Sequence, residues 1–282
     1  MRVGVVGGGL MGSGIAEVCA RSGVDVTVVE VDPERAKRSQ AAIAKSLDRG
    51  VRAGKLAEEA RQASLDRLVF TSELEDVAGA DAAIEAIIED EIAKRELFKR
   101  LDELLPDARF LASNTSSVPI MKLGAGTSKP DRVLGLHFFN PVPVLPLVEI
   151  VHSIMTGDDA AGEARQFAEE TLGKTCIDSQ DRAGFVVNAL LIPYLLSAIR
   201  MYESGFASKE DIDSGMKLGC AHPMGPLALS DLIGLDTLQA VADSLYEEFR
   251  DPASVAPVLL NRMVEAGLMG RKSGRGFYDY SH

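Results

Sequence analysis

The chain has 282 residues, which allows one large domain or two, and its 46% hydrophobic and 26% charged residues are typical of a globular protein and exclude a disordered one. Its net charge of -12 disfavours nucleic acid and anionic membrane surfaces as partners, so a polyanionic ligand would need a local basic patch. The cysteines Cys19, Cys176 and Cys220 are widely spaced and form no CxxC motif, which favours reduced thiols over a disulfide framework or a metal site.

The first element along the chain is a strand over residues 2–6 that opens into a glycine-rich turn. Gly7, Gly9 and Gly12 have the G-x-G-x-x-G spacing, and residues 15–21 have the pattern of a helix. A strand, turn and helix in this order present backbone N–H groups and the positive end of a helix dipole to a diphosphate. Gly7 would allow the tight turn, Gly9 the close approach of a pyrophosphate, and Gly12 the packing of helix on strand. We therefore predict a dinucleotide site rather than a turn that only packs.

Targeting and membrane segments are not expected. The first strand begins at residue 2, which leaves no room for a signal or transit peptide. No apolar run approaches the length that spans a membrane. We expect a cytoplasmic protein with no membrane partner.

A second buried strand, over residues 25–31, ends close to two acidic side chains. An acid at this point accepts hydrogen bonds from the adenosine ribose hydroxyls and repels a 2′-phosphate, so it favours NAD over NADP. Asp32 precedes Pro33, which is the pattern of a helix N-cap, and we therefore assign the ribose to Glu30. The simpler alternative is that Glu30 is a solvated strand end.

A long basic helix is expected over residues 33–52. Arg49, Arg52 and Lys55 cluster near its end. They could form an ordinary solvated helix face, or the local basic patch that would meet ligand phosphates. The residues alone leave both interpretations open.

Short apolar runs at 68–70, 82–86 and 110–112 alternate with helical segments. The clearest helix is 92–105, for which we expect Ile92, Leu97, Leu101 and Leu104 on one apolar stripe. Strands that alternate with helices predict right-handed crossovers and a parallel sheet covered on both faces. A ligand should then bind at the carboxyl ends of the strands.

Polar side chains gather at that predicted edge. Glu89 and Lys94 follow one strand, and a Ser-Asn-Thr-Ser-Ser run at 113–117 follows the next. His137 follows a further apolar run, and Glu149 lies inside another, where an unpaired carboxylate would be costly. A carboxylate beside a histidine stabilises the imidazolium and orients the ring, as removal of an alcohol proton requires. A purely structural His137 remains the alternative.

The pattern changes after residue 183. A helix over 157–172 and an edge strand over 174–178 come before the change. After it we expect only helices, over 185–201, 209–218, 227–249 and 257–266. We therefore predict two domains, 1–183 and 184–282, the second of which would bury its apolar surface against another copy. The aromatic residues of the terminal segment 270–280 suggest docking rather than a flexible tail.

At SNTSS (113–117), followed by GLHFFNPVP (135–143) and LVEIV (147–151), the chain resembles the 3-hydroxyacyl-CoA dehydrogenases, in particular the short bacterial 3-hydroxybutyryl-CoA dehydrogenases. The resemblance extends over essentially the whole chain. Its other motifs are GGGLMGSGIA (7–16), GFVVN (184–188), HPMGPLALSDLIGLD (222–236) and GRKSGRGFYDY (270–280).

The resemblance implies a Rossmann-type doubly wound parallel sheet that binds NAD, and a second, all-helical C-terminal domain that forms a homodimer. It implies oxidation of a short-chain (S)-3-hydroxyacyl-CoA, such as 3-hydroxybutyryl-CoA, to the 3-oxoacyl-CoA, and the reverse reduction of acetoacetyl-CoA. By matched motif, His137 would be the general base and acid, oriented by Glu149. Ser116 and Asn188 would hydrogen-bond the substrate's oxygens.

The resemblance also implies binding residues. Those for the cofactor are Gly7, Gly9, Leu10, Met11, Gly12, Glu30, Glu89, Lys94 and Asn114. Those for the CoA substrate are Arg49, Arg52, Lys55, Ser116 and Asn188. No metal is implied.

The chain departs from the family pattern at three points. Glu30 stands where relatives usually have aspartate, which should preserve the NAD preference. Asp90 stands where relatives often have asparagine, which leaves one cofactor-side contact in doubt. Ala53 stands where relatives tend to have lysine, so Arg52 or Lys55 would have to meet a CoA phosphate there.

Two other functions stay open. A related dehydrogenase on a non-CoA 3-hydroxy acid would share the histidine–glutamate pair but have no use for the basic patch. A dinucleotide-binding regulatory module without turnover would keep the glycines but would not need Ser116, His137, Glu149 and Asn188 together.

Overall fold

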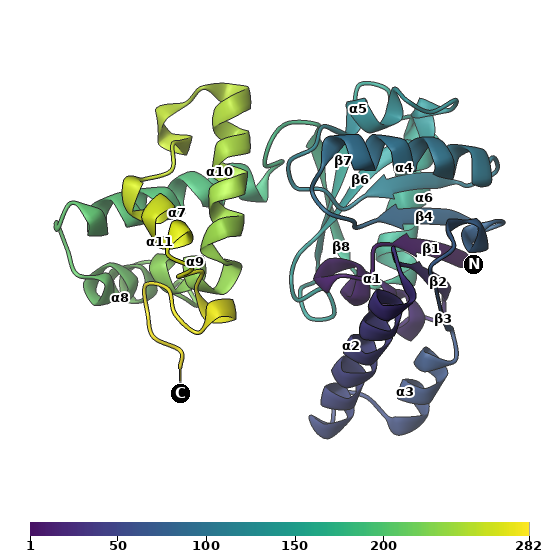
Figure 1. Cartoon of the computed structure of the whole chain (residues 1–282), viewed down its shortest axis with the longest axis horizontal. Helices are drawn as coiled ribbons and strands as arrows, with labels where there is room; N and C mark the ends of the chain where they lie inside the picture. The colour runs from purple at the N-terminus through teal and green to yellow at the C-terminus, as the bar shows by residue number, and fades with distance from the viewer. Residues whose placement is uncertain (282) are drawn as a thin grey trace. The chain divides into compact units, whose positions relative to one another are not determined.

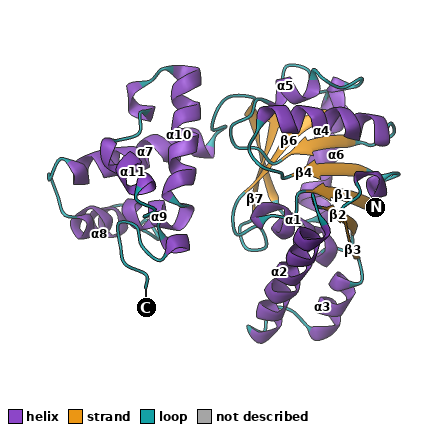
Figure 2. Cartoon of the chain, viewed as in Figure 1, coloured by secondary structure: helices purple, strands orange, loops and turns teal. Residues whose placement is uncertain are grey.

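A computed structural model, which describes residues 1–281, divides the chain into two compact units, Met1–Arg182 and Ala183–His282 (Figure 1). Strands occur in the first unit, and the second consists of helices and loops (Figure 2). Among the described residues, no helix has the length and apolar character needed to cross a membrane. Within the same residues, no group of His, Cys, Asp and Glu side chains could hold a metal ion.

The first unit is built on one eight-stranded sheet with the order β3-β2-β1-β4-β5-β6-β7-β8. The strands are β1 (Arg2–Val6), β2 (Asp25–Val29), β3 (Leu68–Thr71), β4 (Ala82–Glu85), β5 (Phe110–Ser113), β6 (Val133–Phe138), β7 (Leu147–His152) and β8 (Thr175–Gln180). The strand order reverses between β1 and β4, which is the switch point where doubly wound sheets bind ligands. The doubly wound fold predicted from the sequence is confirmed.

Two strands, β7 and β8, depart from the predicted parallel arrangement, because they run opposite to the other six. β7 runs antiparallel to β6, whereas the other neighbouring pairs are parallel. The segment 139–146 between them is too short for a parallel crossover, which needs a dozen residues or more. The chain therefore turns back directly from β6 into β7.

Helices flank the sheet of the first unit. They are α1 (Leu10–Arg21), α2 (Pro33–Arg52), α3 (Glu58–Leu65), α4 (Glu91–Leu104), α5 (Ile120–Gly124) and α6 (Asp158–Gln166). Three short helical segments are the 3₁₀ helices η1 (Leu74–Val77) and η2 (Pro130–Arg132) and the π-helix η3 (Phe167–Thr171). One apolar core joins α1, α2 and α6 to alternate residues of the strands, as the period of two in a pleated strand requires.

The stripe predicted for α4 is partly wrong. Ile92 is 79% exposed, whereas Phe98 and Leu101 are buried. Lys94 occupies the buried position one turn before Phe98, at 1% exposure. The hydrophobic pattern counts lysine as a solvated residue, so the buried face of α4 that contains Lys94 could not be identified from the pattern alone.

The second unit packs its helices around an apolar core of its own. Its elements are α7 (Val187–Glu203), α8 (Lys209–Gly219), α9 (Pro226–Ile233), α10 (Leu235–Phe249), α11 (Val258–Glu265), η4 (Pro252–Ser254) and η5 (Arg271–Ser273). The single helix predicted over 227–249 is two helices, because Gly234 has a φ of 101° and separates α9 from α10.

The terminal segment docks on α9. The buried carboxylate of Asp231 accepts the backbone N–H groups of Phe277 and Tyr278, both at 2.9 Å, and the hydroxyl of Tyr280 at 3.1 Å. Phe277 is part of the core of the unit. The docking expected for this segment is therefore confirmed.

Candidate active site

The glycine turn lies between β1 and α1, at the switch point of the sheet. Gly7 has a φ of +94°, and a Cβ there would lie 2.5 Å from the carbonyl oxygen of Ala86. A Cβ on Gly12 would lie 1.7 Å from the carbonyl oxygen of Gly7, whereas a Cβ on Gly9 would meet no atom within 4 Å. The turn is thus closely packed at two glycines and open at the third.

The N-terminus of α1 is available to an anion. Gly9 is the N-cap of α1, and no side chain accepts a hydrogen bond from the first turn. Leu10 and Met11, the first residues of the helix, are exposed and half-buried respectively. Uncapped N–H groups and the positive end of the helix dipole suit a phosphate.

Two acids follow β2, and the structure gives them different partners. Glu30 accepts the backbone N–H of Gly8 at 2.8 Å, which places its carboxylate against the glycine turn. Asp32 accepts the backbone N–H of Arg35 at 2.8 Å and caps α2, as predicted. The carboxylate beside the glycines is therefore that of Glu30.

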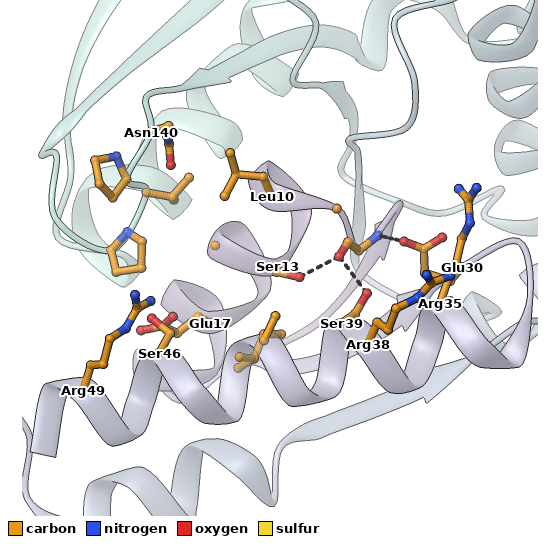
Figure 3. Close-up of a pocket in the computed structure, with 18 residues that line it drawn as sticks. Leu10, Ser13, Glu17, Glu30, Arg35, Arg38, Ser39, Ser46, Arg49 and Asn140 are labelled. Atoms are coloured by element: carbon orange, nitrogen blue, oxygen red, sulfur yellow. Dashed lines mark hydrogen bonds between the residues drawn. The ribbon is translucent and has the colours of Figure 1, made fainter. Parts of the chain in front are cut away.

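A cavity of about 630 Å³ extends from this turn along α2 (Figure 3). Glu30, Arg35 and Arg38 lie at one end, and Glu17, Ser46 and Arg49 lie at the other. Its basic side chains supply the positive charge that a polyanionic ligand would need in this acidic protein.

The basic residues predicted near the end of α2 do not share one position. All three side chains are exposed, but Arg49 lines the cavity, whereas Arg52 and Lys55 are not among its lining residues. Arg52 donates to the carbonyl oxygen of Asp48 at 3.3 Å. Only Arg49 of the three thus faces the site.

Glu17 is a polar wall residue that the sequence reasoning missed. It lies within α1, where its neighbours Ile15, Ala16 and Val18 are apolar and buried. Burial raises the pKa of its carboxyl above the ordinary value, although Ser46 and Arg21 act to lower it. The sequence did contain a signal for Glu17, because it is an isolated acid among apolar helix residues. Burial of a carboxyl group is costly unless it has a polar partner, so such a residue indicates a specific contact.

His137 and Glu149 stand opposite each other because β6 and β7 are antiparallel. The register of the two strands pairs these residues directly. His137 Nδ1 lies 2.6 Å from Glu149 Oε2, and the two residues are 4% and 0% exposed. The carboxylate orients the ring so that Nδ1 carries a proton toward Glu149 and Nε2 points away from it.

Ser116 lies at the other nitrogen of the ring. Its Oγ is 3.0 Å from His137 Nε2. One oxygen atom of a substrate could therefore meet both the imidazole and the hydroxyl. Asn114, two residues earlier, is buried and accepts the backbone N–H of Phe138 at 2.9 Å, which ties the loop to the end of β6.

Glu89 holds the Ser116 loop from the side of α4. Its Oε1 accepts the backbone N–H groups of Ser116 at 2.9 Å and of Ser117 at 3.0 Å, and also the Thr115 hydroxyl. Although partial burial acts to raise the pKa of its carboxyl, the charge of Lys94 and these hydrogen bonds hold it below the ordinary value.

Two further predicted residues have defined places. Asp90 accepts the backbone N–H of Ala93 at 2.8 Å and is the N-cap of α4. Aspartate and asparagine cap helices about equally well, so the departure from the family pattern at Asp90 preserves this structural contact. Asn188 is half-buried in the first turn of α7, in the second unit, whereas Ser116, His137 and Glu149 belong to the first.

Comparison with known families and proteins gives matches over the whole chain. The family described as 3-hydroxyacyl-CoA dehydrogenase, NAD binding domain, matches residues 2–182, and the one described as 3-hydroxyacyl-CoA dehydrogenase, C-terminal domain, matches residues 184–280. A 3-hydroxybutyryl-CoA dehydrogenase of Mycobacterium tuberculosis is 57% identical over 281 residues, which are 99% of this chain and 98% of the relative.

Two other relatives also match over nearly the whole of both chains. A probable 3-hydroxybutyryl-CoA dehydrogenase of Deinococcus radiodurans is 45% identical over 99% of this chain and 100% of its own. The crystal structure of an (S)-3-hydroxybutyryl-CoA dehydrogenase from Ralstonia eutropha has a TM-score of 0.93 and 43% identity, and covers 100% of this chain and 99% of its own.

Proposed function

Since the chain belongs to the 3-hydroxyacyl-CoA dehydrogenase family and is thus an NAD-dependent oxidoreductase, we propose that its substrate is a short-chain (S)-3-hydroxyacyl-CoA. The first candidate is 3-hydroxybutyryl-CoA, in equilibrium with acetoacetyl-CoA. Relatives with this name match over nearly the full length of both chains, which supports the proposal. The observation that carries the chemistry is the contact of His137 with both Glu149 and Ser116.

Proton transfer at the 3-hydroxyl is assigned to the histidine. In oxidation, His137 Nε2 accepts the hydroxyl proton, and the buried carboxylate of Glu149 stabilises the imidazolium that forms. In reduction, the imidazolium returns the proton to the developing alkoxide. Ser116 donates to the same oxygen, and we assign Asn188, by its matched motif, as a further donor to the substrate. Bound NAD supplies the acceptor for the hydride that leaves C3.

The residues at the switch point fit NAD. Gly7, Gly9, Leu10, Met11 and Gly12 would hold the pyrophosphate, because the turn leaves open space at Gly9 and uncapped N–H groups at the start of α1. Glu30 would hold the adenosine ribose. Glu89 after β4, Asn114 after β5 and Lys94 in the first turn of α4 would complete the site.

Arg49 is the residue that we assign to the CoA phosphates. It lines the cavity next to Ser46, which favours a phosphate contact over a merely solvated helix face. Arg52 and Lys55 are exposed near the end of α2 and would add to the positive field there rather than line the cavity. This assignment distinguishes a CoA thioester from a free 3-hydroxy acid.

We assign homodimerisation to the second unit. Leu190 and Met201 of α7 are exposed at 74% and 41%, and a spacing of eleven residues places them on one face of the helix. Phe206 and Leu218 are also exposed apolar residues of this unit, at 79% and 85%. A second copy would bury such side chains. The free state of Cys19, Cys176 and Cys220 fits the cytoplasmic location that we assign.

The proposal is tested by NADH oxidation with purified protein. Acetoacetyl-CoA, free acetoacetate and longer 3-oxoacyl-CoAs are compared at equal concentration. Rapid turnover confined to the C4 thioester supports the proposal. Faster turnover of longer thioesters keeps the chemistry but rejects the C4 substrate. Equal turnover of free acetoacetate rejects CoA recognition, and bound NADH without turnover of any compound favours a non-catalytic module.

A further inference from the structure

Behind the Ser116 loop lies a buried charged cluster whose innermost member, Glu85, has no role in the function proposed above. Glu85 is the last residue of β4 and is 0% exposed. Its Oε1 accepts the backbone N–H of Ile87 at 2.7 Å and lies 2.5 Å from Lys94 Nζ. Its Oε2 accepts the hydroxyl of Ser113 at 2.5 Å. Both oxygens of this carboxylate are thus fixed by buried donors.

Lys94 joins this carboxylate to a second one. Its Nζ lies 2.5 Å from Glu85 and 3.1 Å from Glu89 Oε2, and the lysine is 1% exposed. A buried ion pair adds little net stability, because the cost of removing the charges from water offsets their attraction. The pair does fix the position of the Lys94 ammonium group, because the carboxylate of Glu85 holds it on one side and is itself immobile.

Glu89 divides its two oxygens between the cluster and the loop. Oε2 faces Lys94, and Oε1 accepts the backbone N–H groups of Ser116 and Ser117. The orientation of this carboxylate therefore depends on where Lys94 is held. The hydroxyl of Ser116 lies at the end of the same series of contacts, 3.0 Å from His137 Nε2.

We propose that Glu85 is a positioning residue, which holds the hydroxyl of Ser116 in place for the substrate's oxygen. It acts through Lys94 and Glu89. With a neutral side chain at position 85, Lys94 has Glu89 as its remaining carboxylate partner in the cluster. The ammonium then competes with the loop N–H groups for Glu89, and the loop shifts. The inference rests on the role proposed for Ser116.

The test is a double-mutant cycle of Glu85→Gln and Ser116→Ala in the full-length protein. The readouts are kcat and KM for acetoacetyl-CoA reduction and the Kd of NADH by fluorescence. Displacement of a reacting group by about 1 Å can cost about 100-fold in rate, so we expect Glu85→Gln to lower kcat by about 10- to 100-fold. In the Ser116→Ala background the same change should have almost no further effect, because the positioned group is absent.

Asp102→Asn is the matched control. Asp102 lies on α4, as Lys94 does, and forms another buried ion pair with Arg132 at 2.6 Å. The substitution breaks this pair, but Asp102 has no contact with the Ser116 loop. Asp102→Asn should lower thermal stability and leave kcat unchanged. Should Glu85→Gln fail to fold, Glu85→Asp keeps the charge but shortens the side chain, and it should give a smaller loss of kcat with the same dependence on Ser116.

The outcomes separate the inference from the proposed function. A loss of kcat at saturating NADH that occurs only when Ser116 is present supports the positioning role. Because Lys94 and Glu89 are also assigned to the cofactor, a small rise in the Kd of NADH is expected beside it. Additive losses overturn it, as does a rise in the Kd of NADH that accounts for the whole effect, because Glu85 would then act on the cofactor. Full activity of Ser116→Ala alone would refute the role of Ser116 itself, and the inference with it.

Discussion

The glycine turn makes a prediction in which two similar substitutions have opposite consequences. In Gly12→Ala the new methyl would lie 1.7 Å from a backbone carbonyl oxygen, that of Gly7, so α1 must move away from β1. Overpacking of this kind costs about 1–3 kcal/mol, and we expect the upper end because backbone yields less than a side chain. For a domain of this size, about 3 kcal/mol corresponds to a fall of about 6–12 °C in Tm.

Gly9→Ala should leave stability unchanged and weaken the cofactor. Its methyl meets no protein atom within 4 Å, and its φ of -64° suits alanine, so the change in stability should stay within about 0.5 kcal/mol. The methyl would instead occupy the space assigned to the pyrophosphate. A clash of about 1–3 kcal/mol there raises the Kd of NADH by about 5- to 150-fold.

The assay for both variants combines thermal unfolding without ligand and NADH titration by fluorescence. The reasoning predicts a low Tm for Gly12→Ala, and a normal Tm with weak NADH binding for Gly9→Ala. Normal NADH affinity in Gly9→Ala would refute it, because the pyrophosphate would then not pass over Gly9. A normal Tm in Gly12→Ala would show that the turn can relax in a way the packing does not suggest.

Three further predictions concern charge. Glu30→Ala should shift the ratio of kcat/KM for NADPH to that for NADH by about tenfold or more, equivalent to about 1.4 kcal/mol, because Arg35 and Arg38 line the same end of the cavity. An unchanged ratio would place the ribose contact elsewhere, for example at Asp32. Arg49→Glu should raise the KM for acetoacetyl-CoA, whereas Lys45→Glu, on the same helix but outside the cavity, should not. Equal effects of the two variants would show that Arg49 contributes only to the overall positive charge of the helix and does not contact a CoA phosphate. Burial acts to raise the pKa of Asp102, but Ser128 and Arg132 hold it below the ordinary value of 3.8. The stabilisation from this pair is therefore fully present above about pH 3.8 and is lost as pH falls through the lower pKa of the folded state. In Asp102→Asn, the free energy of unfolding measured with denaturant should fall less steeply as the solution is acidified. An unchanged dependence on pH would contradict the pairing.

Local patterns were sufficient where one residue type has one physical use. The glycines of the first turn, the cap at Asp32 and the alternation of strands and helices follow from backbone geometry alone, and the structure has each of them. The pairing of His137 with Glu149 needed more. It follows from the antiparallel return of β7, which depends on how short the segment 139–146 is.

Lys94 was among the predicted site residues, but its buried ion pair with Glu85 could not be predicted, because the pair depends on burial of charge. Lys94 occupies an apolar position of α4, and Glu85 ends an apolar strand, so each is a polar exception in its own pattern. Only the fold brings the two to a distance of 2.5 Å, at which their attraction offsets the cost of removing both charges from water. Glu17 and Ser46 likewise meet only because α1 packs beside α2.

The most direct test of the account is the turnover of His137→Gln with acetoacetyl-CoA and NADH. Loss of a general acid or base costs about 10²- to 10⁴-fold in rate, and the account predicts a fall in kcat of this size with the Kd of NADH unchanged. The histidine would then act on the proton and not on the cofactor. Activity within about tenfold of the original, outside that range, would contradict the assignment of His137 as the base.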